Sequence, residues 1–287
     1  MQNNPRYQQM LDLLISNALQ EDIGEGDLST LCAIPENAMG KAVLKLKQSG
    51  ILAGMQVAEA IFKKMEPGIT FTPLKNDGDR ILPGQQAFEV TGKVHTLLSG
   101  ERLVLNCMQR MSGIASLTHT YVEQLDGLNT RLLDTRKTTP NFRLLEKEAV
   151  RIGGGQNHRF GLYDMIMLKD NHIDYCGGIE PAILKAYHFV QQKHPGIGIE
   201  VETRSLADVE EVMRVGKVSR IMFDNFNVEE TRQAVKMVNS RFETESSGGI
   251  HLGNLREYAS TGVDFISSGA IIHQAVSLDM SLKAVIQ

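Results

Sequence analysis

The sequence has few cysteines and lacks any segment typical of a secretion signal or a membrane span. Its three cysteines, Cys32, Cys107 and Cys176, lie far apart, which excludes a disulfide scaffold and a zinc knuckle with closely spaced ligands. The N-terminal residues are polar, and no apolar run approaches the length of a bilayer-spanning helix. We therefore expect a cytoplasmic protein with reduced cysteines and no membrane partner.

The sequence also lacks an overall positive charge and a solenoid-type repeat. Its net charge of -4 does not favour a nucleic-acid partner. The 287 residues are 42% hydrophobic and 22% charged, as in ordinary soluble globular proteins, and they suffice for one barrel or for two smaller domains.

Positive charge is nevertheless concentrated in one region, residues 131–172. This region contains eight Lys and Arg residues but only five Asp and Glu residues. The excess of positive charge suggests that an anionic ligand binds there. Three of the cations, Arg143, Lys147 and Arg151, recur every four residues and are interpreted instead as one solvated helix face.

The first part of the chain predicts a mixed α+β unit. Apolar residues at helical spacing predict a helix over residues 6–20, and alternation predicts a strand over 41–47. A helix is expected over 57–65, short strands near 71 and 87–90, and a helical stretch over 97–125 with a break at Ser112-Gly113. We place the domain boundary inside this stretch, which gives an N-terminal domain of residues 1–115.

From residue 131 onward, short apolar runs alternate with helical segments. Strands are expected at 131–133, 165–168, 197–201, 220–223, 241–244 and 263–267, with helices near 142–151, 179–193, 206–215, 228–238 and 252–259. This alternation predicts a parallel sheet with helical crossovers, either barrel-like or open. The second domain is expected to span residues 116–272.

Polar or glycine residues follow each apolar run and should gather at one rim, because the carboxyl ends of parallel strands share an edge. Arg136, Lys137, His158, Arg159 and Lys169 would be costly to crowd there unless an anion neutralises them. Paired carboxylates suit that role, since arginine recognises a carboxylate with two prongs. A lone arginine at a strand end would more often form a salt bridge.

Acidic and small residues complete the expected rim. Glu202 and Asp224 each end a strand-like run, where they could hold magnesium or sugar hydroxyls, or pair with nearby cations. Ser247-Gly248-Gly249 and Ser268-Gly269 close the last two runs, where backbone N–H groups could approach a phosphate, although Ser-Gly-Gly is also an ordinary turn.

Ten motifs in order along the chain resemble the quinolinate phosphoribosyltransferase family. They include Glu21–Thr30, Gly100–Asn106, Ser112–Ala115, Thr135–Pro140 (Thr-Arg-Lys-Thr-Thr-Pro), Gly153–Arg159, Leu168–His172, Glu200–Glu202, Phe223–Asn225, Ser247–Gly249 and Leu278–Leu282. The resemblance implies an α/β fold with an N-terminal α/β sandwich domain, an incomplete parallel α/β barrel of the type II phosphoribosyltransferases, and a C-terminal helix over 273–287 that packs back on the first domain.

The resemblance also implies substrates, a cofactor and a partner. Quinolinate, phosphoribosyl pyrophosphate and Mg²⁺ would react in a homodimer or higher homo-oligomer whose active site is completed by the neighbouring subunit. The implied quinolinate ligands are Arg102 (reaching across to the partner's site), Arg136, His158, Arg159 and Lys169. Lys137 and Thr138 would contact substrate, Lys137 on the pyrophosphate side. Ser247, Gly248, Gly249, Ser268 and Gly269 would hold the 5-phosphate.

The implied reaction yields nicotinate mononucleotide, pyrophosphate and CO₂. Glu202 and Asp224 would bind the metal and stabilise the positive charge that builds on the sugar, while magnesium and Lys137 stabilise the leaving pyrophosphate. Lys137, Lys169, Glu202 and Asp224 are thus the expected catalytic residues. Once alkylated, the pyridine nitrogen accepts the electrons left by the departing carboxylate.

Three alternatives stay open at this point. A relative of the same fold could act on another acceptor such as nicotinate, although the full set of cations favours a dicarboxylate. A barrel aldolase could use Lys137 or Lys169 as a Schiff base. A protein that only binds anions would give Glu202 and Asp224 no task.

Overall fold

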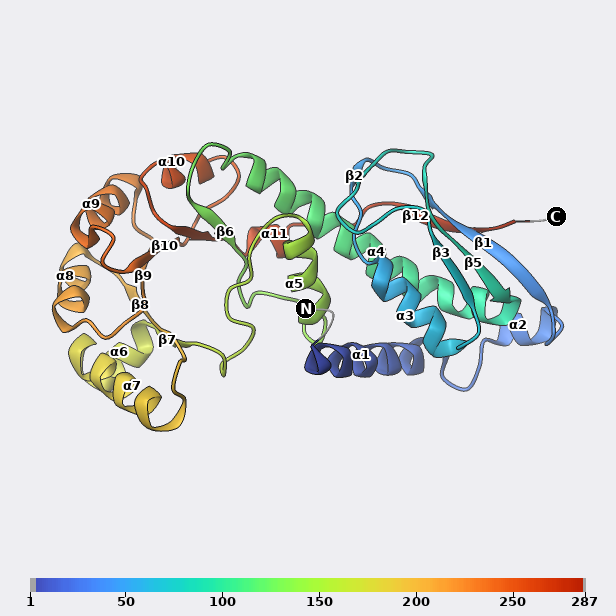
Figure 1. The fold of residues 1–287 in the computed structure, drawn as a ribbon, viewed down its shortest axis with the longest axis horizontal. Coiled ribbons are helices and arrows are strands. Elements are labelled where there is room, and N and C mark those ends of the chain that lie inside the picture. Colours follow the sequence, from blue (N-terminus) through green and yellow to red (C-terminus); the bar gives the residue numbers. More distant parts are fainter. Residues whose placement is uncertain (1–3, 286–287) are drawn as a thin grey trace. The chain divides into compact units, whose positions relative to one another are not determined.

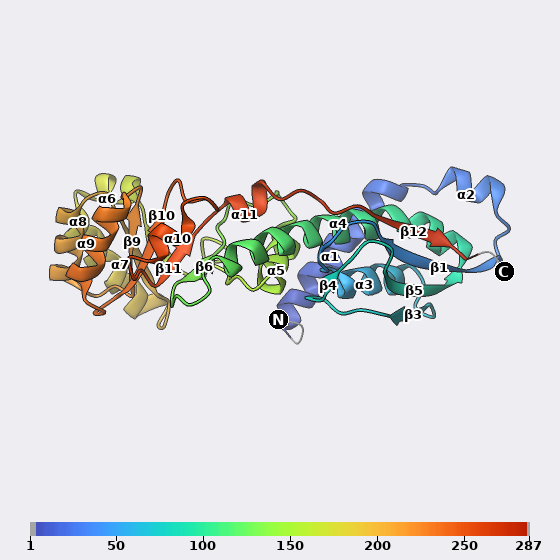
Figure 2. The same ribbon diagram turned by 90° about the horizontal axis from the view of Figure 1, so that it is seen from above.

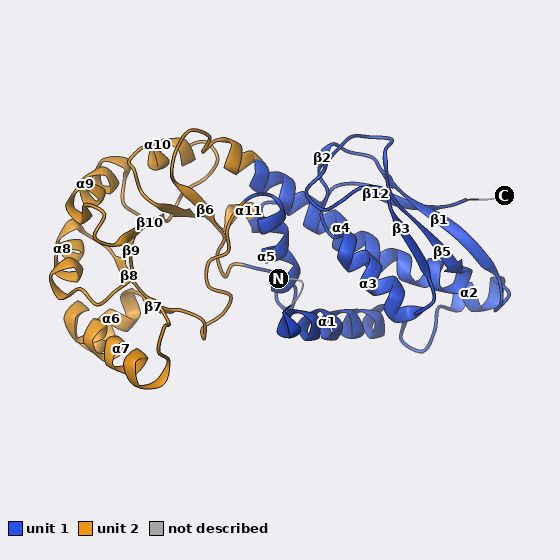
Figure 3. Ribbon diagram, viewed as in Figure 1, with its two compact units in different colours: residues 1–119, 138–154, 272–287 blue, residues 120–137, 155–271 orange. Residues whose placement is uncertain are grey.

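The computed structural model describes residues 4–285 and divides them into two compact units (Figure 3). Unit 1 contains residues 1–119, 138–154 and 272–287 as far as they are described, and unit 2 contains residues 120–137 and 155–271. No helix in the described part of the chain is long and apolar enough to cross a membrane.

Unit 1 is built on a four-stranded antiparallel sheet of order β12-β1-β5-β3. Its strands are β1 (Met39–Leu46), β3 (Thr70–Pro73), β5 (Gln86–Lys93) and β12 (Met280–Ala284), and a small second sheet pairs β2 (Gly50–Ile51) with β4 (Arg80–Ile81). Its helices are α1 (Pro5–Ile23), α2 (Leu28–Ala33), α3 (Met55–Met65), α5 (Arg143–Ile152) and most of α4 (Val94–Glu123), whose residues 120–123 belong to unit 2. Helix α11 (Ala270–His273) spans the boundary, with residues 270–271 in unit 2 and 272–273 in unit 1. Phe62 of α3 and Phe88 of β5 meet edge to face in the core of unit 1.

The helical stretch over 97–125 is confirmed, but the break expected at Ser112-Gly113 is wrong, because α4 runs on to Glu123. Both residues have packing roles instead. The Ser112 hydroxyl accepts a hydrogen bond from the Ala53 amide at 2.9 Å. A Cβ on Gly113 would lie 2.1 Å from the carbonyl oxygen of Val276, so only glycine allows this close approach.

The C-terminal helix expected over residues 273–287 is wrong for residues 273–285, and residues 286–287 lie outside the described part of the chain. Residues Met280–Ala284 form β12, which pairs antiparallel with β1 and places Leu282 opposite Leu44. Figures 1 and 2 show the two strands side by side. Met280 and Leu282 are buried while Lys283 is exposed, the period of two that a strand requires. The segment returns to unit 1, but as a strand.

Unit 2 contains the predicted parallel sheet, of order β6-β11-β10-β9-β8-β7. The strands are β6 (Arg131–Leu133), β7 (Ile166–Leu168), β8 (Ile199–Thr203), β9 (Arg220–Asp224), β10 (Glu243–Ser247) and β11 (Phe265–Ser267). The helices are α6 (Asp170–Cys176), α7 (Ile179–Lys193), α8 (Leu206–Val215), α9 (Val228–Val238) and α10 (Leu255–Ala259), and they line the outside of the curved sheet (Figure 1). Among the described strands β6 and β7 do not pair with each other, so the barrel is incomplete.

One expected element belongs elsewhere. The helix predicted near 142–151 exists as α5 but lies in unit 1, where Glu146 accepts from the Arg110 guanidinium at 2.9 Å. The interpretation of Arg143, Lys147 and Arg151 as a solvated face is wrong for Lys147, which is only 2% exposed.

Candidate active site

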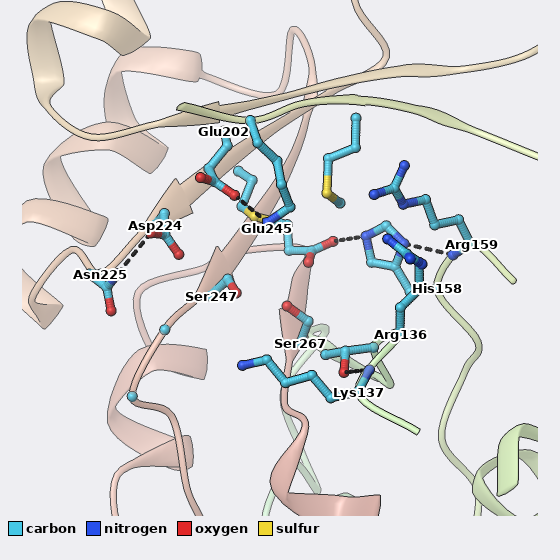
Figure 4. A pocket seen from close by; sticks show the side chains of 16 residues that line it. Arg136, Lys137, His158, Arg159, Glu202, Asp224, Asn225, Glu245, Ser247 and Ser267 are labelled. Atoms are coloured by element: carbon cyan, nitrogen blue, oxygen red, sulfur yellow. Dashed lines mark hydrogen bonds and ion pairs between the residues drawn. The ribbon is translucent and has the colours of Figure 1, made fainter. Parts of the chain in front are cut away.

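A pocket of about 540 Å³ lies at the carboxyl ends of the strands of unit 2. Ten of the residues expected at the rim line it, namely Arg136, Lys137, His158, Arg159, Lys169, Glu202, Asp224, Ser247, Gly248 and Gly249 (Figure 4). The prediction that these residues gather in one place is therefore confirmed.

Strand alternation explains why acidic side chains enter the pocket. Side chains two residues apart share a face of a strand, so Glu200 and Glu202 of β8 point the same way. Glu202 lies opposite Met222 of β9, and Asp224 lies opposite Ser247 of β10. The inner faces of three adjacent strands thus supply the acidic side of the pocket.

The cations of the pocket lie close to one another and to the acids. Lys169 Nζ is 2.9 Å from Glu202 Oε2. The pKa of Arg159 is lowered mainly by burial and, to a smaller extent, by the positive charge of Arg136. Crowded guanidinium groups on a pocket wall favour an anionic ligand, because such a ligand relieves their repulsion.

Asp224 is oriented by its neighbour. Asn225 Nδ2 donates to Asp224 Oδ2 at 2.7 Å, and the Asn225 backbone adopts φ of 57°. The pKa of Asp224 is raised mainly by burial and, to a smaller extent, by the negative charge of Glu202. The second effect means that the two carboxylates lie near enough to repel each other. Two adjacent carboxylates are an oxygen donor set that fits Mg²⁺, which also takes ligands from substrate phosphates.

The loop after β10 is shaped by two glycines with left-handed backbone. Gly248 has φ of 92° and Gly249 has φ of 63°. A Cβ on Gly248 would lie 2.2 Å from Asn225 Oδ1, whereas a Cβ on Gly249 would meet no atom within 4 Å. Such loops expose backbone N–H groups, which suit a phosphate.

His158 is held from two sides. Buried Asp134 at the end of the β6 run accepts hydrogen bonds from the His158 backbone N–H at 2.8 Å and from Asn157 Nδ2 at 2.7 Å. On the ring, Nε2 lies 3.1 Å from Glu200 Oε2. It also lies 3.3 Å from Glu245 Oε2, the contact drawn in Figure 4. The other ring nitrogen, Nδ1, accepts the Arg159 backbone N–H at 2.6 Å.

The ring of His158 is under two opposing electrostatic demands. Burial lowers its pKa, but the close contacts of Nε2 with the carboxylates of Glu200 and Glu245 outweigh burial and raise it. The hydrogen bond from Arg159 works the other way, because Nδ1 can accept it only while it carries no proton. Protonation of the ring and the position of the Arg159 backbone are therefore linked.

His158, Glu200 and Glu245 are also residue types that bind metal ions, and their donor atoms lie within 4.8 Å of one another. Arg220 argues against an ion there. Its Nη1 lies 2.9 Å from Glu245 Oε2, the same oxygen that faces His158, and its guanidinium lies over the Phe265 ring. A fixed cation already balances the acids, so further positive charge would be repelled.

Four expected site residues are not among the pocket's lining residues. Arg102 is an exposed residue of α4 in unit 1, and Thr138, also in unit 1, accepts a hydrogen bond from Arg143 Nε. Ser268 is buried and donates to the Ile250 carbonyl at 3.0 Å, and Gly269 follows it. Their roles stay predictions.

Six lining residues were not named as site residues from the sequence, namely Thr135, Met167, Met222, Asn225, Glu245 and Ser267. Strand alternation was the available signal for most of them, since Met222 is two residues from Asp224 and Glu245 is two residues from Ser247. The rule that site residues follow the end of each strand does not cover side chains within the strand that point to the pocket.

Comparison with known proteins agrees with this geometry. The family models "Quinolinate phosphoribosyl transferase, N-terminal domain" and "Quinolinate phosphoribosyl transferase, C-terminal domain" match residues 27–112 and 114–283. Quinolinate phosphoribosyltransferase [decarboxylating] 1b of Nicotiana tabacum is 41% identical over 94% of this chain and 81% of its own length. A probable nicotinate-nucleotide pyrophosphorylase [carboxylating] of Bacillus subtilis is 42% identical over 95% of this chain and 92% of its own length.

Solved structures are similar over the same extent. The NadC structure from Streptococcus pyogenes has a TM-score of 0.89 at 40% identity and covers 96% of this chain and 97% of its own. The nicotinate-nucleotide pyrophosphorylase from Francisella tularensis has a TM-score of 0.89 at 35% identity, with 96% of each chain covered. Human nicotinic acid phosphoribosyltransferase, at 13% identity and a TM-score of 0.61, shares the fold alone. This chain belongs to the quinolinate phosphoribosyltransferase family.

Proposed function

We propose that the pocket of unit 2 is where this chain performs its family's reaction, the decarboxylating transfer of phosphoribose from phosphoribosyl pyrophosphate to quinolinate. The observation that carries the proposal is the convergence of Arg136, Arg159 and Lys169 on one pocket that also contains Glu202 and Asp224. A dicarboxylate and an activated sugar phosphate together need this combination of charges.

Quinolinate would lie against the cationic wall. Arg136 and Arg159 offer planar, two-pronged donors that match a carboxylate, and Lys169 offers a point charge. Burial, and after it the positive charge of Arg136, lowers the pKa of Arg159, and the repulsion between the two guanidinium groups would be relieved when the ring acid binds. Met167 and Met222 line the same pocket and could contact the apolar faces of the pyridine ring.

Phosphoribosyl pyrophosphate would lie between the acids and the glycine loop. Gly248 and Gly249 adopt left-handed backbone, so their N–H groups could approach the 5-phosphate, and we place Ser247, Ser268 and Gly269 on the same side. Glu202 and Asp224 would hold Mg²⁺, which would supply positive charge to the leaving pyrophosphate when bound.

The chemistry of this chain's own residues follows from charge. Breaking the bond from ribose C1 to pyrophosphate leaves positive charge on the sugar, and the carboxylates of Glu202 and Asp224 stabilise it. Lys137 stabilises the departing pyrophosphate. Lys169 binds Glu202 in the free protein, so quinolinate would draw it away and leave that carboxylate to face the sugar.

Other expectations remain part of the proposal. Arg102 would act in the active site of a partner subunit, and Thr138 would contact substrate. Mixing Arg102→Ala subunits with Asp224→Asn subunits should then restore activity, because a mixed dimer contains one intact site. A cytoplasmic location also remains a prediction, and the relative from Arabidopsis thaliana is named as chloroplastic.

The central experiment is to incubate the protein with quinolinate, phosphoribosyl pyrophosphate and Mg²⁺ and to measure nicotinate mononucleotide and CO₂. Arg136→Ala should raise the dissociation constant of quinolinate far more than that of phosphoribosyl pyrophosphate, and Arg136→Lys should also bind quinolinate poorly because it loses the two-pronged contact. Equal weakening of both substrates would refute the assignment of Arg136.

The rival chemistries predict other results. A Schiff-base aldolase would be trapped by borohydride with a carbonyl substrate, but Lys169 is engaged with Glu202, which ties up the amine such an enzyme needs. An enzyme specific for nicotinate would turn over the monocarboxylate without releasing CO₂.

A further inference from the structure

Glu200 and Glu245 are buried acids, the second of which lines the pocket, and the proposed reaction gives neither of them a role. We propose that Glu200 and Glu245 are positioning residues that fix the ring of His158 and, through it, the backbone of Arg159 at the pocket wall. The inference rests on the proposed function only in taking Arg159 as a quinolinate ligand.

The burial of this pair needs an explanation. The side chains of Glu200 and Glu245 are 0% exposed, and that of His158 is 5% exposed. Burying a carboxylate costs several kcal/mol unless it is paired and hydrogen-bonded, and apolar side chains of similar size would often be as stable. The interiors of parallel barrels are usually filled by branched apolar residues, so an acid pair here suggests a task other than stability.

The charged groups near this pair come from β9, from β10 and from the loop that carries His158. Arg220 of β9 lies 2.9 Å from Glu245 and 3.0 Å from Glu243 of β10. Its position opposite Glu200 in the sheet brings it below both acids. His158, on the loop before β7, approaches from the pocket side. The acids therefore stand between a structural arginine below and a pocket histidine above.

The contacts give His158 one orientation. With Nε2 directed at the two carboxylates, Nδ1 is turned to the Arg159 backbone N–H, which it accepts at 2.6 Å. A ring turned by half a rotation would present carbon atoms to both partners. The acids thus set the ring, and the ring sets the point from which the Arg159 side chain extends toward a substrate carboxylate.

The test uses Glu200→Gln and Glu245→Gln, which keep side-chain volume and remove the charge. Glu243→Gln is the matched control, because Glu243 also binds Arg220 from the same strand but is 53% exposed and is not in contact with His158 among the described interactions. We expect each of the first two variants to raise the dissociation constant of quinolinate by about tenfold, as when a group that orients a ligand-binding side chain is lost. Binding of phosphoribosyl pyrophosphate should change much less, and the control should change neither.

A double-mutant cycle separates positioning from mere structure. In a His158→Asn background, Glu245→Gln should weaken quinolinate binding no further, because its effect passes through the ring. An equal loss in both backgrounds, or an equal loss for both substrates, would overturn the proposal. Unchanged quinolinate binding by folded Glu200→Gln and Glu245→Gln would overturn it as well.

Nitrogen NMR of the wild-type histidines covers the case in which a variant does not fold. The His158 ring, assigned by its loss in His158→Asn, should show a proton on Nε2 and an acceptor at Nδ1, and the opposite tautomer would overturn the proposal. This measurement needs no substrate. If the wild-type protein showed no turnover, the proposed function would be refuted, whereas the NMR result would still decide the role of the acids.

Discussion

Replacing Gly248 by alanine should damage unit 2 more than any ordinary glycine substitution. A left-handed backbone costs a residue with a Cβ about 1–2 kcal/mol. At Gly248 the new Cβ would also lie 2.2 Å from Asn225 Oδ1 and 2.9 Å from the Asn225 backbone nitrogen. Asn225 cannot yield freely, because its backbone N–H donates to the Ser247 carbonyl at 2.8 Å. Overpacking of this kind costs a further 1–3 kcal/mol or so, and we therefore expect a total loss of about 2–5 kcal/mol.

Gly127→Ala is the matched control for backbone strain alone. Gly127 also lies in unit 2 and has φ of 82°, but a Cβ there would meet no atom within 4 Å. We expect it to lower the free energy of unfolding by no more than about 1–2 kcal/mol. Urea denaturation followed by circular dichroism measures both variants, and equal losses would refute the argument that the contact with Asn225 matters.

Gly248→Ala should also impair substrate binding in a selective way. Displacing Asn225 breaks its hydrogen bond to Asp224 Oδ2, so the dissociation constant of phosphoribosyl pyrophosphate should rise more than that of quinolinate. Titration calorimetry with each substrate alone measures the difference. A larger loss for quinolinate would contradict the placement of Asp224 beside the sugar.

Two further predictions concern stability. Arg220→Met should cost about 3–5 kcal/mol in urea denaturation because it leaves Glu245 buried without its cation, whereas Arg214→Met, which removes an exposed ion pair, should be nearly neutral. Leu282→Ala should cost about 2–5 kcal/mol because Leu282 is buried against β1, and Lys283→Ala, at an exposed position, should be nearly neutral in the same denaturation assay.

Much of the pocket could be predicted because parallel strands bring their carboxyl ends to one edge. Lys169, Glu202 and Asp224 follow or end their strands, and the structure brings them together. Glu245 could not be found in that way, since the strand was expected at 241–244 and β10 in fact spans Glu243–Ser247. The strand thus begins two residues later than expected. A shift by two leaves the same side chains on the inner face, but it moves Glu245 from the expected loop into the strand.

The C-terminal strand was missed for a different reason. Met280 and Leu282 alternate with Ser281 and Lys283, which is the period of a half-buried strand. Five such residues form no stable structure alone. They form a strand because they pair with the edge of β1. Lys47 and Asp279, which are in contact just outside the two strands, are 232 residues apart in the sequence. Local sequence carries no signal for so distant a partner.

The two faces of the strands in unit 2 carry separate tasks. Val201, Ile221 and Phe223 are 0% exposed and alternate with Glu200, Glu202, Met222 and Asp224, so the apolar set faces the outer helices and the polar set faces the interior. Each outer side chain contributes about 1.5–3 kcal/mol by burial, while the inner acids contribute little net stability after desolvation. The hydrophobic layer therefore holds the sheet in place against the cost of burying charge inside it. A barrel filled with apolar side chains on both faces would be more stable, but it would have no means of orienting His158 from below.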